Sequence, residues 1–323
     1  MESLDSKRQN TGARWAFWQK RAAANPTGGS RTLRRREAIA FHLFISPWLI
    51  GLIAFTLVPF AASAYLSLTY YEVLLPPKWV GLRNYVDLFQ DRLIYHSLKV
   101  TAIYAVGSVS LGTVVAFSLA LLMNQKVFGI NLLRTLYYLP STLSGVPVAL
   151  LWMWIFSPNF GLLNKALAVF GIEGPQWLFD RTWVLPSLIL MSLWGAGGGM
   201  VIYLAGLQSI PHHLYEAAEL DGAGGWRKFC HITIPMMTPV LFFNLVTSII
   251  MAFRTFTSAY VMTGGGPAHA SLFYVLYLFR KAFTSHRMGY ACAMAWVLAA
   301  IVMVLTVVLF RSSSRWVYYA SGE

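Results

Sequence analysis

Long stretches without a charged residue dominate this chain and limit what it can fold into. A helix needs about 20 mostly apolar residues to cross the hydrocarbon core of a bilayer. The chain is 57% hydrophobic and only 11% charged, whereas soluble domains carry about 25% charged residues. We therefore predict an all-α integral membrane protein whose solvent is lipid over most of its length. The uncharged stretches are 38–71, 100–125, 135–164, 182–215, 232–253, 255–279 and 288–310.

These stretches predict six transmembrane helices, because one of them is interrupted. The segment 263–267 holds three glycines followed by a proline, a combination that ends a helix. The pieces on either side of it are too short to cross a membrane. We predict that 255–263 continues the preceding helix, with Arg254 inside it, and that 268–281 forms a short interfacial helix.

The distribution of Lys and Arg predicts the orientation of the chain. With six spans, 15 of the 25 basic residues fall on the side that holds both termini, and nine fall on the other side. Cytoplasmic segments carry the excess of basic residues, so we place both termini in the cytoplasm. The formal net charge of +13 then reflects membrane topology, and we expect no nucleic-acid partner.

The predicted organisation has three parts. Residues 1–38 form a basic cytoplasmic tail, 39–311 the transmembrane domain and 312–323 a cytoplasmic C-terminal tail. Around Trp15 and Trp18, the first tail either forms a short helix on the membrane surface or is unstructured. Both interpretations stay open.

The cytoplasmic loop 208–231 carries the most specific pattern. Pro211 suits a helix start and Asp221-Gly222 a helix stop, which indicates a small helix–turn–helix. Its first helix places Leu214, Ala217 and Ala218 on one face. Such a small, smooth face fits a groove in another protein. Three acidic residues in a loop on the basic side favour this docking role over packing of the loop on its own helix ends.

Glu216-Ala217-Ala218 followed by Asp221-Gly222-Ala223 resembles the EAA loop of the permease subunits of ABC importers. Other segments resemble the same family, in particular the maltose-transporter-like first permease of carbohydrate importers: 79–85, 139–141, 152–164, 262–267 and 288–291. The resemblance runs from about residue 40 to the end of the chain. It implies a type I ABC importer permease fold in the cell membrane, with Glu216, Ala217, Ala218, Asp221 and Gly222 coupling the chain to an ATPase.

The resemblance also implies partners. These are a second homologous permease subunit, two ATPase subunits and an extracytoplasmic substrate-binding protein, assembled in membrane lipid. The chain has no Walker-type phosphate loop, so we expect ATP and Mg to be bound by the ATPase subunits. We expect no cofactor, catalytic residue or metal site in this chain.

The cargo that the resemblance implies is a sugar or oligosaccharide, moved from the binding protein into the cytoplasm by alternating access. A polyol, glycerol phosphate or another small solute stays an alternative. A membrane-embedded enzyme is an alternative from another class. It would need paired acids or clustered histidines at membrane depth, and the sequence offers no such set.

In maltose-like permeases the substrate pocket lies on the fourth and fifth spans. By this resemblance the candidate substrate-path residues are Trp194, Gly195 and Gly198 on the fourth span, and Ser248, Met251, Ala252, Arg254 and Thr255 on the fifth. An aromatic face and a few hydroxyl groups suit a sugar. Small residues are equally typical of helix–helix packing, and this alternative stays open. Arg254 either contacts substrate or snorkels to the outer interface. The run 197–199 of three glycines permits a close helix approach or lines a cavity.

Overall fold

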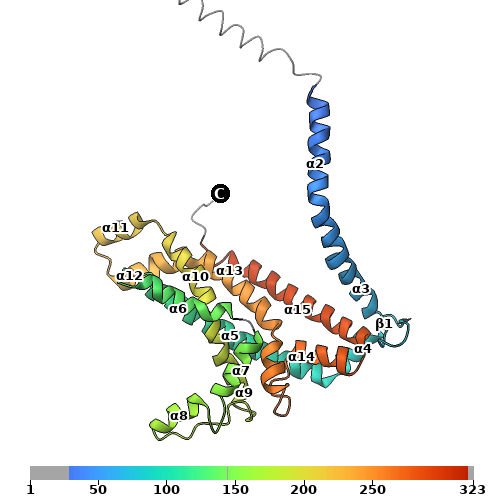
Figure 1. The fold of residues 1–323 in the computed structure, drawn as a ribbon. Coiled ribbons are helices and arrows are strands. Elements are labelled where there is room, and N and C mark those ends of the chain that lie inside the picture. The colour runs from blue at the N-terminus through green and yellow to red at the C-terminus, as the bar shows by residue number, and fades with distance from the viewer. Residues whose placement is uncertain (1–28, 144, 319–323) are drawn as a thin grey trace, which may run out of the picture. The chain divides into compact units, whose positions relative to one another are not determined.

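The computed structural model describes residues 29–143 and 145–318. The segment around Trp15 and Trp18 lies outside the described residues. The chain divides into two compact units, 1–63 and 64–323 (Figure 1). A single helical segment occupies the described part of the first unit. It consists of α2 (Gly29–Leu52), a π-helical turn η1 (Ile53–Leu57) and the start of α3 (Val58–Ser67). The helix therefore begins ten residues before the predicted span boundary at residue 39.

The second unit is a helical bundle. Its elements are β1 (Thr69–Tyr70), β2 (Lys78–Trp79), α4 (Arg83–Gln90), α5 (Arg92–Met123), α6 (Ile130–Thr142), α7 (Gly145–Ile155), α8 (Leu162–Val169), α9 (Val184–Ser192), η2 (Leu193–Gly195), α10 (Ala196–Gln208), α11 (His212–Leu220), α12 (Gly225–Lys228), η3 (Phe229–Thr233), α13 (Ile234–Phe253), η4 (Ala259–Thr263), α14 (Tyr274–Phe279), η5 (Arg280–Thr284) and α15 (Met288–Ser313). The two short strands pair antiparallel, Thr69 opposite Trp79. Helix α5 packs against both α10 and α13, and α13 also packs against α15 (Figure 1).

Within residues 29–143 and 145–318, five helical segments are long and apolar enough to cross a membrane: 33–67, 92–123, 184–209, 225–253 and 288–313. A sixth crossing is possible only if α6 and α7 count together, and these two helices meet at a bend of 101°. The predicted stretch 135–164 is therefore not one straight helix. Leu143 turns to an extended backbone (ψ 136°) at the end of α6, three residues after Pro140, and proline is a common cause of such breaks.

The predicted helix through Arg254 is wrong. Helix α13 ends at Phe253, and Arg254 is its C-terminal cap, with φ −96° and ψ 5°. The chain becomes helical again only at residue 257. Arg254 is exposed and lies where a basic residue complements the negative end of the helix dipole.

The short helix predicted within 268–281 is present as α14, and it is packed into the bundle. Helix α14 packs against α5 and α15, and Tyr274 and Leu276 are fully buried. The Tyr274 hydroxyl donates to the Met294 carbonyl of α15 at 2.9 Å. The interfacial position of this helix stays a prediction.

Asp91 ties three elements together at the start of α5. Its Oδ1 accepts from the Leu93 N–H at 2.9 Å and so caps the helix. Its Oδ2 accepts from the hydroxyls of Tyr277 at 2.6 Å and Tyr290 at 3.0 Å. Burial acts to raise the pKa of Asp91, but these hydrogen bonds and the nearby Lys281 ammonium outweigh it and hold that pKa below its usual value.

Candidate functional site

The predicted helix–turn–helix forms at the end of the bundle where α10 stops. Helix α11 covers His212–Leu220, directly after Pro211. Gly222 follows in the left-handed region with φ +74°, a conformation that suits glycine at a helix C-terminus. Helix α12 then begins at Gly225 and continues through η3 into α13. The prediction of a short helix, a glycine stop and a second helix leading to the membrane is confirmed.

The faces of α11 differ from the simple Leu–Ala stripe that the spacing suggested. Leu214 and Tyr215 are partly buried against the bundle, and the Tyr215 hydroxyl lies 3.0 Å from Thr233 Oγ1. Glu216 and Ala217 are exposed. Leu214 therefore holds the loop to its own helix ends, and the surface free for a partner is centred on Glu216 and Ala217.

Two large apolar side chains at the tip of the loop were missed in the sequence. Leu220 is 90% exposed and Trp226 is 76% exposed. Beside them lies a recess of about 370 Å³ that is lined by Ala218, Ala223, Arg227, Lys228, His231 and Ile232. Exposed apolar residues beside polar ones are typical of a surface that binds another protein. The available signal was two bulky apolar residues flanking the turn.

An ion pair closes the loop. The Lys228 ammonium lies 2.6 Å from Glu219 Oε1, and this hydrogen bond and its charge hold the pKa of Glu219 below its usual value. The contact connects α11 with α12 across Gly222. The side chain of Glu219 is 63% exposed, and an exposed ion pair adds little to stability. The contact therefore sets the position of α11 relative to α12 and does not stabilise the bundle.

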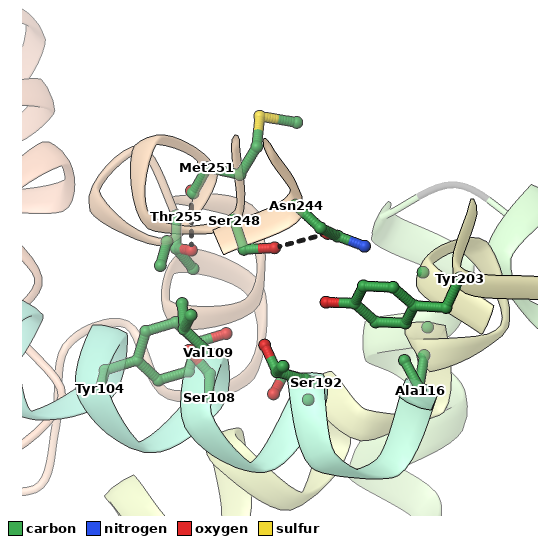
Figure 2. Close-up of a pocket in the computed structure, with 16 residues that line it drawn as sticks. Tyr104, Ser108, Val109, Ala116, Ser192, Tyr203, Asn244, Ser248, Met251 and Thr255 are labelled. Carbon is green, nitrogen blue, oxygen red and sulfur yellow. Dashed lines mark hydrogen bonds between the residues drawn. The ribbon is translucent and has the colours of Figure 1, made fainter. Parts of the chain in front are cut away.

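A cavity of about 280 Å³ lies among α5, α10 and α13 (Figure 2). Each helix contributes one stripe at helical spacing, and the lining residues are Tyr104, Ser108, Val109, Gly112, Thr113, Ala116, Ser192, Gly195, Ala196, Gly199, Tyr203, Asn244, Ser248, Met251, Ala252 and Thr255. The lining is hydroxyl, amide, aromatic and small apolar, and none of these residues is charged.

Five of the eight predicted substrate-path residues line this cavity: Gly195, Ser248, Met251, Ala252 and Thr255. Trp194 lines an adjoining recess together with Gly195. Gly198 instead faces Ser141 of α6, and a Cβ there would lie 3.7 Å from the Ser141 Cβ. Arg254 is absent from the lining of either space. Whether any of the eight contacts a substrate stays a prediction.

Sequence reasoning missed the polar residues that face these positions. They are Tyr104, Ser108 and Thr113 on α5, Ser192 and Tyr203 on the α9–α10 segment, and Asn244 on α13. Hydroxyl groups recurring on one face of the stretch 100–125 were an available signal. Without the packing of α5 against α10, nothing distinguished that face from the others.

Within residues 29–143 and 145–318, no group of three or more His, Cys, Asp or Glu side chains is placed to hold a metal ion. The features that stand out are a polar, uncharged cavity within an apolar bundle and an exposed helical loop. Helix α10 connects them directly, since it lines the cavity and only three residues separate its end at Gln208 from the start of α11 at His212. A polar cavity inside an apolar helical bundle is typical of a membrane permease subunit.

The comparisons with known proteins agree. The chain belongs to the family of binding-protein-dependent transport system inner membrane components, whose model matches residues 108–315. It is 44% identical over 299 residues to the probable ABC transporter permease protein YesP of Bacillus subtilis, covering 91% of this chain and 96% of that protein. It is 34% identical over 241 residues to the trehalose/maltose transport system permease protein MalF of Thermococcus litoralis, covering 74% and 82%.

A solved structure has the same fold. The crystal structure of a bacterial ABC transporter involved in the import of the acidic polysaccharide alginate matches with a TM-score of 0.76 and 25% identity, covering 87% of this chain and 96% of that chain. The predicted type I ABC importer permease fold and the predicted membership of the ABC importer permeases are confirmed. The protein is a transporter permease subunit of a binding-protein-dependent system.

Proposed function

We propose that this chain is the permease subunit through which a neutral sugar or oligosaccharide passes from an extracytoplasmic binding protein to the cytoplasm. The observation that carries the proposal is the cavity lining, which offers hydroxyl, amide and aromatic groups and no ionisable acid or base other than tyrosine. A sugar presents hydroxyl groups around flat C–H faces. Hydrogen-bonding side chains beside aromatic and small apolar surfaces complement both features.

The residues that line the cavity also distinguish the proposed sugar cargo from the alternative functions. Glycerol phosphate carries a charged phosphate, which proteins usually bind with Arg, Lys or clustered backbone N–H groups. Arg, Lys and His are all absent from the cavity lining, and this favours an uncharged solute. A neutral polyol fits the same groups and stays the second candidate. A membrane-embedded enzyme would need a catalytic set, and the cavity holds no carboxylate, histidine or cysteine.

The cavity supports a role for a second permease subunit. Met251 lines the cavity and is nevertheless 66% exposed, so the cavity is open along the side of α13 where Met251 lies. A second, homologous subunit placed there would close the pathway. Both subunits would then provide a share of the substrate contacts, with both termini of this chain in the cytoplasm.

The loop supports a role for a cytoplasmic ATPase. Glu216 and Ala217 are exposed, and Leu220 and Trp226 extend the same tip with apolar surface. An ATPase groove that received α11 would move a helix connected to α10 and hence to the cavity. ATP and Mg bound in the ATPase subunits would in this way bias the two access states of the permease pair.

The cargo is tested by uptake. The chain is assembled with its second permease, ATPase and binding protein in proteoliposomes, and the binding protein is supplied outside. Uptake of ¹⁴C-labelled glucose, maltose, trehalose, sorbitol and glycerol 3-phosphate is then measured with ATP inside. We expect ATP-dependent uptake of at least one of the sugars. Uptake of glycerol 3-phosphate alone would overturn the proposal of a neutral cargo.

Coupling is tested with two alanine substitutions in the loop. Gly222→Ala places a Cβ on a residue with φ +74°, a conformation that costs an L-residue roughly 1–2 kcal/mol. Gly224→Ala is the matched control, because Gly224 has φ −68° and a Cβ there meets nothing within 4 Å. We expect Gly222→Ala to assemble in the membrane but to lose much of the solute-stimulated ATP hydrolysis, and Gly224→Ala to keep it. Equal ATPase stimulation in both variants would contradict coupling through the α11 turn.

A further inference from the structure

Two buried polar atoms in the cavity wall form no hydrogen bond of ordinary length, although the Thr113 side chain of α5 interacts with one of them, the Tyr203 hydroxyl. They are the Tyr203 hydroxyl of α10 and the Asn244 Nδ2 of α13. Both side chains are at least nine-tenths buried, with Tyr203 1% exposed and Asn244 9% exposed. Buried donors and acceptors in folded proteins are almost always paired, and an exception needs an explanation such as a missing ligand.

Both atoms lie at the same end of the cavity. Asn244 precedes Thr255 by 11 residues along α13 and the turn after it, which corresponds to roughly 16 Å at about 1.5 Å per residue. Tyr203 follows Ser192 by 11 residues in the α9–α10 segment and lies five residues before the end of α10. This end of the cavity is therefore the end closer to α11, away from Thr255 and Ser192.

The amide of Asn244 is held in one orientation. Its Oδ1 accepts from the Ser248 hydroxyl at 3.2 Å, so its Nδ2 is the atom left to donate. Figure 2 shows the Tyr203 ring beside this amide, with the Tyr203 hydroxyl directed toward the space between Ser192 and Ser248. Donor groups come from two different helices, and neither has a partner on its own helix.

Gly199 packs closely beside the two side chains. A Cβ at Gly199 would lie 3.4 Å from Asn244 Nδ2, 4.0 Å from Tyr203 Cε2 and 3.1 Å from the Ala116 Cβ. A larger residue at this position would press on the Asn244 amide and on Ala116. The glycine therefore lets α10 bring Tyr203 close to the amide of α13.

We propose that Tyr203 and Asn244 form a second binding station for a hydroxyl group of the transported solute, at the end of the cavity nearest the coupling loop. The proposal rests on the proposed function, since it names a neutral polyhydroxylated solute as the ligand. A hydroxyl accepts from the Asn244 N–H and exchanges a hydrogen bond with the Tyr203 hydroxyl, which satisfies both groups at once. The solute then occupies this station after it leaves Ser248 and Thr255 and before it reaches the cytoplasm.

The test uses variants that keep the shape of each side chain and remove its polar atoms. Tyr203→Phe and Asn244→Leu are compared with Tyr260→Phe and Thr247→Val, because Tyr260 in η4 and Thr247 on α13 lie outside the cavity lining. All four are assembled into the complete transporter. Two quantities are measured: KM for the ¹⁴C-labelled sugar that the wild-type transporter takes up, and the thermal midpoint of the complex without solute.

We expect KM to rise about tenfold in Tyr203→Phe and in Asn244→Leu, because each loses one hydrogen bond to the solute, and to stay constant in both controls. We also expect the thermal midpoint of Tyr203→Phe without solute to be equal to or higher than that of the wild type, since a buried polar atom without a hydrogen bond has been removed. Asn244→Leu also removes the acceptor of the Ser248 hydroxyl, so only its KM is used. An unchanged KM in both cavity variants, or a thermal midpoint of Tyr203→Phe that falls together with uptake, would overturn the station.

The two proposals fail in different ways. If the wild-type transporter takes up none of the labelled sugars, the proposed cargo is wrong. The thermal measurement still decides on the station in that case. A lower midpoint in Tyr203→Phe then shows that the Tyr203 hydroxyl is structural and overturns the station, whereas an equal or higher midpoint supports a site whose ligand is not one of these sugars.

Discussion

Gly197 allows the closest approach between α6 and α10, and replacing it with alanine should separate the two helices. A Cβ on Gly197 would lie 2.0 Å from the Tyr137 carbonyl oxygen and 3.0 Å from the Tyr138 Cα. Both are backbone atoms, so no side-chain rotation relieves the contact. An ordinary contact begins at 3.4 Å, which means that α6 and α10 would have to move apart by about 1.4 Å.

The adjacent glycine is the matched control. A Cβ on Gly198 meets only Ser141, with its nearest atom at an ordinary 3.7 Å. Both substitutions gain about 1 kcal/mol of helix propensity, and this gain cancels when the two variants are compared. Overpacking costs roughly 1–3 kcal/mol, and a clash with backbone belongs at the upper end. We therefore expect Gly197→Ala to be less stable than Gly198→Ala by about 3 kcal/mol.

The assay is the thermal midpoint of the assembled transporter in detergent, followed as the fraction that stays monodisperse on size-exclusion chromatography after heating. A change of 1 kcal/mol shifts the midpoint by roughly 2–4 °C in a chain of this order of size. The midpoint of Gly197→Ala should therefore lie about 6–12 °C below that of Gly198→Ala. Equal midpoints would show that α6 and α10 do not pack through Gly197, and the described geometry of this contact would be wrong.

Two further outcomes follow from single contacts. Tyr277→Phe removes one of the hydrogen bonds to the Asp91 carboxylate and should lower stability by about 1.5–3 kcal/mol at neutral pH, measured by thermal unfolding. The pKa of Asp91 is depressed in the folded protein, so its contribution is present above the unfolded pKa and is lost as pH falls. The difference between Tyr277→Phe and wild type should therefore shrink as the pH is lowered through the acidic range, and a constant difference would contradict this account. Arg254 is exposed at the end of α13 and outside the cavity, so Arg254→Gln and Arg254→Leu should both keep the wild-type rate of ¹⁴C-labelled sugar uptake; loss in Leu but not in Gln would instead indicate a polar contact with the solute.

Much of the loop 208–231 was predictable because its structure is local. A proline start, a glycine stop and a second helix start lie within 15 residues of one another, from Pro211 to Gly225. Each of these residues acts on the backbone conformation within a few positions of itself. The burial of Leu214 was not predictable, because it depends on the bundle surface that the loop meets.

The breaks in the predicted spans show the limit of hydropathy. Arg254 ends a helix inside the predicted span that joins 232–253 to 255–263, and the bend between α6 and α7 falls inside the predicted stretch 135–164. Hydropathy measures the cost of transfer into lipid and is insensitive to backbone direction. Segment 268–281 is apolar in sequence, and only its packing against α5 and α15 decides that it lies inside the bundle.

The sequence by itself determined the lipid environment, the approximate number of spans and the helix–turn–helix of the loop 208–231, since composition and short-range spacing are properties of the chain alone. The tertiary structure decided which polar groups share a cavity. Tyr203, Asn244 and Ser108 come from three helices that are distant in sequence, and each is unremarkable in its own segment. They form one site because glycines such as Gly197 and Gly199 let α10 approach its neighbours closely. How closely two helices approach depends on the surfaces of both, and it cannot be predicted from the sequence of one helix alone.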